Sequence, residues 1–193
     1  MPHKILTKVI VMYKAVLSRK DITAQTEYYG FIKDILCDTQ VQQMVNFRHH
    51  KGTTRLQHSL NVSYYNYKVC KFLKLDARSA ARAGLLHDFF LHDWRTRTPV
   101  EGEGWHGVGH PKVALSNASE QFSINAVEGD MILNHMWPLS PRLPRYRETH
   151  IIQLVDKFCA AAEVMTHLCS VGRYRLQPVA TFAVMLLIKL NLK

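Results

Sequence analysis

The sequence predicts an all-α protein, and three observations support that prediction. Prolines and glycines are few, at seven and nine among 193 residues, so only short parts of the chain carry turn signals. Apolar residues recur at spacings of three and four, which places them on one face of a helix. The strict alternation that is typical of half-buried strands is scarce. A single domain over residues 1–193 is expected, because this length suits one hydrophobic core.

The apolar spacing places eight helices along the chain. In the first helix, Ile5, Val9 and Met12 share one face. In the third, a similar face begins at His58 and continues through Val62. The expected helices span residues 4–19, 24–36, 56–74, 77–90, 110–121, 124–136, 146–169 and 177–190.

Local signals refine two of these helices. Asp76 is a good N-cap for the fourth helix, because its carboxylate can accept hydrogen bonds from the first backbone N–H groups. Small residues follow it, among them Gly84, and they allow close packing against a neighbouring helix. His110-Pro111 is expected to open the fifth helix, with proline at its favoured first position.

The ends of the chain and its cysteines indicate the cellular compartment. The N-terminal segment is too interrupted by lysines to be a signal peptide. The stretch VATFAVMLLI, about ten residues long, is far shorter than the ~20 residues that cross a bilayer, so we expect it to be a buried core helix. Four cysteines without a C-x-x-C pair favour buried, reduced thiols. A cytoplasmic protein without a membrane segment is therefore expected.

The charge balance indicates an anionic partner. Lys and Arg number 25 against 15 Asp and Glu, which gives a formal net charge of +10. Such an excess attracts anions, although solubility alone can also explain it. The sequence has no run of basic residues and no nucleic-acid recognition motif, so nucleic acid is not the favoured partner. A phosphorylated small molecule or a nucleotide fits the scattered excess better.

An adjacent His-Asp pair, His87-Asp88, stands in the apolar frame AGLLHDFF. Neighbouring side chains on a regular helix point about 100° apart, so they rarely share a partner. The end of a helix relaxes that limit and lets both groups converge on one metal ion. Imidazole suits Zn, Fe, Mn and similar ions, and a carboxylate can also bridge two ions. The pair is therefore a candidate for metal binding.

Four further residues extend this candidate set along the chain. An aspartate on an apolar helix face, as at position 156, is costly unless it is paired or bound to a metal. Each of the four, taken alone, is more typical of a helix cap, an ion pair or a hydrogen-bonded core histidine. Their joint presence on apolar helices favours a buried metal centre. The six candidate ligands are His58, His87, Asp88, His110, His135 and Asp156.

The arrangement resembles the HD-domain superfamily of metal-dependent phosphohydrolases. The match consists of His58 in LQHSLNVS, His87-Asp88 in AGLLHDFF and Asp156 in IIQLVDKFCA, and it covers about residues 50–166. The resemblance implies an HD-type helical bundle whose core spans about 45–170, with flanking helices at both ends. It also implies that these four residues bind one metal ion.

The order His, His-Asp, His, His, Asp is similar to the dinuclear branch of that superfamily. By this resemblance His58, His87 and Asp156 hold one ion, the other two histidines hold a second, and Asp88 bridges them. His87 and Asp88 then carry catalysis, and a water or hydroxide between ions roughly 3.5–4 Å apart is the nucleophile. Two divalent ions are expected, chosen among Fe, Mn, Co, Ni and Zn. His106 is the alternative to His110 as a ligand.

The sequence departs from the pattern of this superfamily at a position that concerns substrate binding. Many members carry Gly-Lys soon after the His-Asp pair, and the lysine contacts phosphate, but here the sequence continues HDFFLHDWR. Cations elsewhere must take that role, although each is individually more typical of a solvated surface residue. The predicted substrate-binding residues are Arg55, Lys112, Lys51 and Arg145. His49 and His50 are expected to lie within reach of the mouth of the predicted site, where they can contact substrate. Glu163 is either an ordinary helix residue or a partner of a ligand histidine.

The resemblance implies an enzyme that hydrolyses a phosphate ester or anhydride of a nucleotide or small phosphorylated metabolite by means of a metal-bound hydroxide. Two alternatives stay open. Some domains with this ligand set are di-iron oxygenases, and the ligands alone do not separate the two classes. A binding module that keeps metal without turnover is the third interpretation.

Overall fold

The computed structural model describes residues 15–18, 21–22, 24–49, 52–93, 106–140 and 142–170. The predicted helix over 177–190 lies outside these residues, as does most of the helix over 4–19. Residues 15–18, the described part of the first predicted helix, form a turn. The side chains of 106–108 are not described either.

Within the described residues the fold is all-α, as predicted. An isolated antiparallel bridge pairs Arg48 with Thr54. The helices are α2 (Thr26–Leu36), α3 (Thr39–Gln43), α4 (Arg55–Phe72), α5 (Ala77–Leu86), α6 (His106–Gln121), α7 (Ala126–Asn134) and α8 (Arg147–Ser170), with a 3₁₀ turn, η1 (Met44–Asn46), between α3 and α4.

Side-chain caps define where several helices begin. Asp38 accepts from two backbone N–H groups at the start of α3, and the hydroxyl of Thr54 accepts from Gln57 N in α4. Asp76 caps α5 by accepting from Ser79 N, which confirms the prediction for that residue. Asn125 and the third residue of α7 form a reciprocal capping box. These caps satisfy N–H groups that have no partner inside their own helix.

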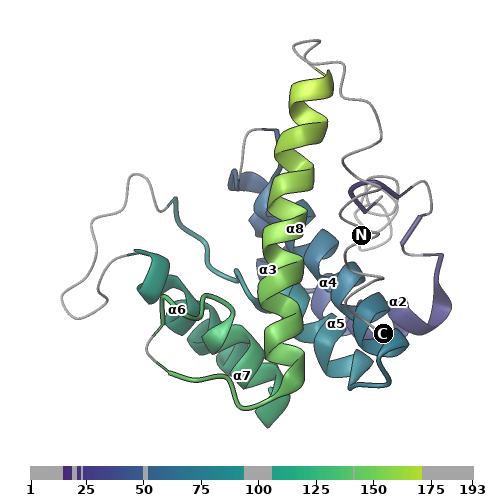
Figure 1. The fold of residues 1–193 in the computed structure, drawn as a ribbon. Coiled ribbons are helices and arrows are strands. Elements are labelled where there is room, and N and C mark those ends of the chain that lie inside the picture. Colours follow the sequence, from purple (N-terminus) through teal and green to yellow (C-terminus); the bar gives the residue numbers. More distant parts are fainter. Residues whose placement is uncertain are drawn as a thin grey trace.

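Close packing of α4 against α5 forms the centre of the bundle. Gly84 of α5 lies directly on α4, since a Cβ atom there would stand 2.6 Å from Ser63 Cα. Figure 1 shows α8, the longest described helix, with α6 and α7 on one side and α2, α4 and α5 on the other. The apolar core lies between these helices and includes Tyr28, Leu60 and Ile152.

Asp130 fixes the start of α8 from the neighbouring helix α7. Its Oδ2 accepts from Thr149 Oγ1 at 2.5 Å, from Arg145 N at 3.0 Å and from Tyr146 N at 3.3 Å. Its Oδ1 accepts from Asn134 Nδ2 one turn further along α7. The carboxylate therefore serves as a cap supplied by another helix, and it fixes α8 against α7.

Three further sequence predictions about local structure are wrong. Helix α5 ends at Leu86 and does not continue to residue 90, so His87 is its C-cap. Helix α6 begins at His106, so Pro111 lies inside it and not at its first position. Glycines before residue 110 concealed that start, because they carry no apolar pattern. Of the four free cysteines, Cys37 and Cys169 are exposed, although all four were expected to be buried.

Candidate metal centre

His58 projects from the second turn of α4 into the core and is fully buried. Its Nδ1 lies 3.1 Å from Glu163 Oε1, and its Nε2 lies 3.0 Å from Asp156 Oδ1. Both carboxylates come from α8. Because carboxylate oxygens only accept when ionised, a proton or a cation must lie between Nε2 and Asp156.

The same contacts determine the charge of His58 in the absence of a metal ion. Burial alone lowers the pKa of its imidazole, but hydrogen bonds to Asp156 and Glu163 outweigh burial and raise it to about 10. The pKa of Asp156 is lowered despite its own burial, chiefly by the hydrogen bond to His58. A proton therefore occupies the position that a metal ion can take.

His87 and His135 are positioned by one shared local arrangement. Each is the C-cap of its helix, α5 or α7, and each directs Nδ1 at a carbonyl oxygen three residues earlier. The distances are 2.9 Å to Gly84 O and 2.8 Å to Ile132 O. A carbonyl oxygen only accepts, so Nδ1 carries the proton in both rings and Nε2 offers a lone pair to the interior.

Asp88 follows His87 at the end of α5 and is surrounded by imidazoles. Its Oδ1 lies 3.4 Å from His110 Nε2, and its Oδ2 lies 3.8 Å from His87 Nε2. Burial raises the pKa of this carboxyl, but electrostatic interaction with the neighbouring histidines, His87 first, brings it well below its usual range. The carboxylate is therefore ionised and has histidine nitrogens on several sides.

His110 of α6, the sixth candidate ligand, lies next to His135. Their Nε2 atoms are only 2.9 Å apart. Two nitrogens this close need a proton or a cation between them. Burial, with the neighbouring His110 and His87, lowers the pKa of His135 to about 3, so His135 stays neutral. Neutral imidazole is the form that binds metal ions.

The structure thus brings the six predicted ligands into one buried cluster. Two groups within it have donor atoms that all lie within 4.8 Å of one another. The first group is His58, His87 and Asp156, and the second is His87, Asp88 and His135. Nitrogen and carboxylate oxygen donors of this kind suit Zn, Fe, Mn, Co or Ni. The residues present therefore fit one or two divalent ions, while the binding of metal itself stays a prediction.

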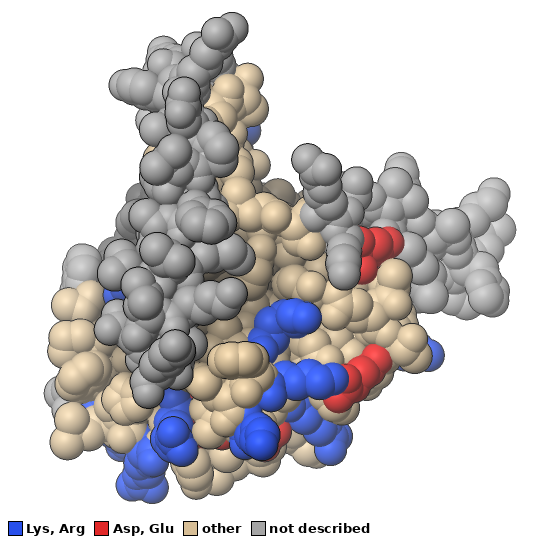
Figure 2. Space-filling view, turned by 45° about the vertical axis from the view of Figure 1, so that its right-hand side comes forward, with Lys and Arg blue, Asp and Glu red and all other residues tan. Residues whose placement is uncertain are grey.

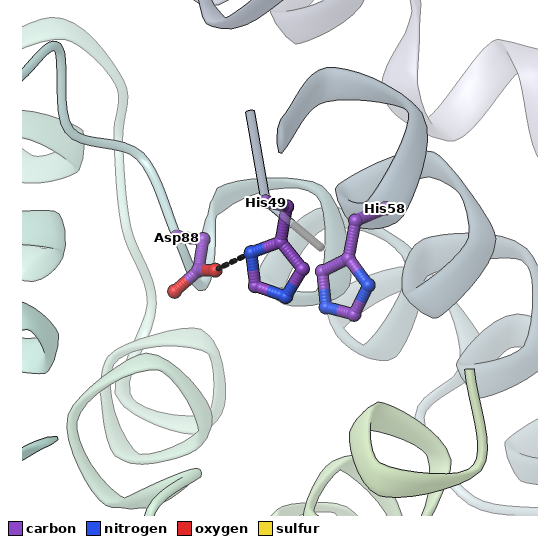
Figure 3. Close-up of side chains that lie close together, drawn as sticks. All are labelled: His49, His58 and Asp88. Atoms are coloured by element: carbon purple, nitrogen blue, oxygen red, sulfur yellow. Dashed lines mark ion pairs between the residues drawn. The ribbon is translucent and has the colours of Figure 1, made fainter. Parts of the chain in front are cut away.

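A third group adds His49, which sequence reasoning placed only near the mouth. Its donor atom lies within 4.8 Å of donors from His58 and Asp88. Figure 3 shows its ring between these two side chains, with Nδ1 directed at Asp88 Oδ2 over 3.4 Å. His49 lies beside a chain reversal that precedes α4 and is closed by the bridge between Arg48 and Thr54. Nothing in the local sequence indicates where this reversal places the side chain of His49. Its neighbour His50 is outside the described residues.

Two buried glutamates beyond the six have different partners. Glu163 accepts from Asn61 Nδ2 at 2.7 Å as well as facing His58, so it orients a candidate ligand histidine. Glu128 pairs with Arg82 at 2.9 Å and belongs to the capping box of α7. Glu163 was expected to be either an ordinary helix residue or a partner of a candidate ligand histidine, and its contact with His58 is of the second kind.

The four predicted substrate-binding cations lie in different surroundings. Arg55 is 1% exposed, and its guanidinium donates to Phe90 O at 2.5 Å. Lys112 on α6 is exposed, and so is Arg145 just before α8. Lys51 is outside the described residues. Figure 2 shows one face of the molecule on which basic side chains gather with few acidic ones among them.

The position of Arg55 favours a structural role over contact with substrate. Its guanidinium stacks on the ring of Phe90 at 3.7 Å and also donates to His92 O at 3.1 Å. It therefore holds the segment that follows the His-Asp pair. His92 lies in that segment with its ring 4.9 Å from Phe90, outside the three donor groups. His106, the alternative ligand, begins α6, but its side chain is not described.

The fold and the cluster together define an all-α protein with a buried set of imidazole and carboxylate donors. Comparison of the chain with family models, curated proteins and solved structures finds no match. Among the described helices, none is both long and apolar enough to cross a membrane.

Proposed function

We propose that this chain is a metal-dependent phosphohydrolase of the HD type with a dinuclear centre. The observation that carries the proposal is the pairing of two donor groups through one histidine. His87 belongs both to the group with His58 and Asp156 and to the group with Asp88 and His135. His87 offers only its Nε2 lone pair and can serve one ion, whereas Asp88 can serve both, because its two oxygens face His87 and His110. This arrangement suits two ions held close together, as two-metal hydrolysis requires.

The proposed roles of the residues follow from their contacts. The first ion is assigned to His58, His87 and Asp156, and the second to His110 and His135, with Asp88 bridging. Such ions would supply Lewis acidity and would lower the pKa of a bound water molecule, so that a nucleophile would be available at neutral pH. Glu163 and the carbonyl groups of residues 84 and 132 hold three imidazoles in the orientation that binds cations.

The proposed substrate is a phosphorylated small molecule or a nucleotide in the cytoplasm. The formal charge of +10 attracts such anions to the molecule. Lys112 and Arg145 are exposed, and each lies on or beside an element that carries a ligand, so both are proposed to bind the rest of the substrate. An exposed cation binds ground state and transition state to a similar extent, so these residues would set affinity more than rate.

Metal analysis of the freshly purified chain, followed by a screen of phosphorylated metabolites with each metal, tests this proposal. We expect about two ions per chain and release of inorganic phosphate from at least one substrate class. His150→Gln is a matched control, because His150 is exposed on α8 and its ring packs edge-on against Trp137. A chain that binds no divalent ion, or one that binds ions without hydrolysing any phosphorylated compound, would contradict the proposal.

A further inference from the structure

His49 lies on a segment that reverses direction before α4, and backbone contacts join the two sides of the reversal. The bridge between Arg48 and Thr54 joins the two sides, and His49 N donates to Thr53 O at 3.0 Å. Gly52 has φ +89°, a conformation that glycine adopts without strain. The position of His49 is therefore determined by hydrogen bonds within the segment.

Two other elements fix the same segment from outside. The guanidinium of Arg55 lies over the ring of Phe47 at 5.1 Å as well as that of Phe90 at 3.7 Å, so it joins the segment to the chain after the His-Asp pair. On α8, His167 contacts the reversal closely, because a Cβ atom on Gly52 would lie 2.5 Å from His167 Nδ1. His49 is thereby held against the centre by α4, α8 and the end of α5.

The ring of His49 makes two contacts with candidate ligands. It stacks on the ring of His58, with centroids 3.8 Å apart and planes 17° apart, and its Nδ1 lies 3.4 Å from Asp88 Oδ2. Figure 3 shows the two rings nearly parallel. The side chain of His49 is 19% exposed, whereas that of His58 is 0% exposed. His49 thus lies between the solvent and two members of the centre.

The stacking decides whether His49 and His58 can bind the same ion. The lone pair of an imidazole nitrogen lies in the ring plane, and ligand nitrogens stand about 2.0–2.1 Å from a metal such as zinc. Planes that are 3.8 Å apart at their centroids and tilted by only 17° do not converge within that distance. The distances alone admit His49 as a ligand beside His58, but the ring orientation opposes it.

We propose that His49 is a positioning residue of the metal centre, which orients Asp88 by donating its Nδ1–H to Oδ2 and fixes the ring plane of His58 by stacking. This inference rests on the proposed metal centre. A donated hydrogen bond leaves the remaining lone pairs of the Asp88 carboxylate for the ions and limits its rotation. The stack keeps His58 Nε2 directed at Asp156, where the first ion is assigned.

Two substitutions separate the two contacts. His49→Asn keeps an N–H donor near the position of Nδ1 but removes the ring, whereas His49→Phe keeps a stacking ring without a donor. The experiment titrates the metal-free full-length chain with Co²⁺ alone and records visible absorption, affinity and the melting temperature. His150→Phe, on the exposed face of α8, is the matched control.

We expect His49→Phe to bind Co²⁺ about 10–100-fold more weakly, as is usual when a residue that orients a ligand is lost, with a shifted absorption spectrum. His49→Asn should recover most of the affinity, and the smaller loss that remains should reflect the missing stack on His58. The melting temperatures of both metal-free variants should stay near that of the wild type. A merely structural role would lower the melting temperature and leave the spectrum of the folded fraction unchanged.

Three results would overturn the inference, and they differ from failure of the proposed function. If the wild type binds Co²⁺ and His49→Phe matches it in affinity and spectrum, His49 has no role in the centre although the centre stands. If His49→Asn is as weak as His49→Phe, donation to Asp88 is not the mechanism. If X-ray absorption shows one imidazole fewer around cobalt in both variants, His49 is a ligand. A wild type that binds no Co²⁺ removes the proposed function as well.

Discussion

The carboxylate of Glu163 lies 3.1 Å from Nδ1 of His58, although 105 positions separate the two residues in the chain. This contact joins α4 to α8 directly beside the candidate metal centre, and Asn61 Nδ2 strengthens it by donating to the same oxygen, Oε1. The pairing fixes the orientation of the imidazole and leaves its Nε2 directed at Asp156. Metal-binding histidines are commonly held by a carboxylate in this way.

Glu163→Gln is predicted to weaken the first metal site. The amide can still accept from His58 Nδ1, but it loses the negative charge that makes the imidazole more basic. Metal affinity should fall about 10–100-fold, measured by Zn²⁺ or Co²⁺ titration of the metal-free chain. Glu120→Gln on the exposed face of α6 serves as the control and should bind like the wild type. Equal affinity in Glu163→Gln would argue against its role as the partner of a ligand.

Asp88→Ala and His110→Ala are predicted to differ in metal content. If Asp88 bridges, its loss removes a ligand from both ions, so elemental analysis should find neither ion and turnover should cease. His110→Ala should weaken only the second site. Asp88→Ala should also lose the stabilisation that metal binding gives the folded chain, seen as a melting temperature that no longer responds to added metal. Wild-type metal content in Asp88→Ala would exclude the bridging role.

Most of the described helices, and the polar residues on their apolar faces, were predictable because their signals are local. Apolar spacing locates most of the described helices to within a few residues, although it missed α3, and Asp76 has the side chain that caps α5. His87 and His135 stand in apolar runs that are visible in the sequence, and in the structure each is the C-cap of its helix. These features do not depend on contacts between distant parts of the chain.

The surroundings of Arg55 and His49 depend on such distant contacts. Arg55 stands three positions before His58, and its partners are carbonyl groups at positions 90 and 92, which no local pattern indicates. His49 reaches Asp88 only because the chain reverses before α4. A sequence shows which residues are basic or aromatic, but it does not show which backbone groups a long side chain meets after packing.

Binding of the first ion is predicted to release a proton from His58. The pKa of His58 in the metal-free fold is raised from 6.5 to about 10, because its two carboxylate contacts outweigh burial. This group therefore stabilises the metal-free fold fully below pH 6.5, and that contribution is lost as the pH rises through about 10. At pH 8 the folded chain still holds the proton, and a metal ion must displace it.

Calorimetric titration in buffers of different ionisation enthalpy measures this release. The observed binding enthalpy at pH 8 should change between buffers in proportion to about one released proton. In Glu163→Gln the released fraction should be smaller, since one of the two carboxylates that raise the pKa of His58 is gone. Binding enthalpies that are identical in every buffer would show that His58 is already neutral in the metal-free chain.

Lys112→Ala and Arg145→Ala are predicted to raise KM with little change in kcat. Both side chains are exposed, so their contacts with a substrate phosphate are similar in the ground state and the transition state. Added salt should weaken wild-type binding in the same direction, because exposed charges are screened beyond about 8 Å at physiological ionic strength. Lys33→Ala on α2 is the control for general charge loss. An unchanged KM in the double variant would move substrate binding to other cations.

Exchange of the metal and removal of dioxygen are predicted to leave turnover intact. Hydrolysis needs a Lewis acid and an activated water, so it should persist under strict anaerobiosis and with a redox-inert ion such as Zn²⁺. An oxygenase built on the same ligands needs iron that changes oxidation state. The formal charge of +10 favours an anionic substrate, but it does not distinguish a phosphate ester from a phosphonate. The discriminating assay is therefore product formation with and without air in chains loaded with iron or zinc. Turnover confined to iron and air, with ¹⁸O₂ label found on carbon in the product, would replace the hydrolase with the oxygenase.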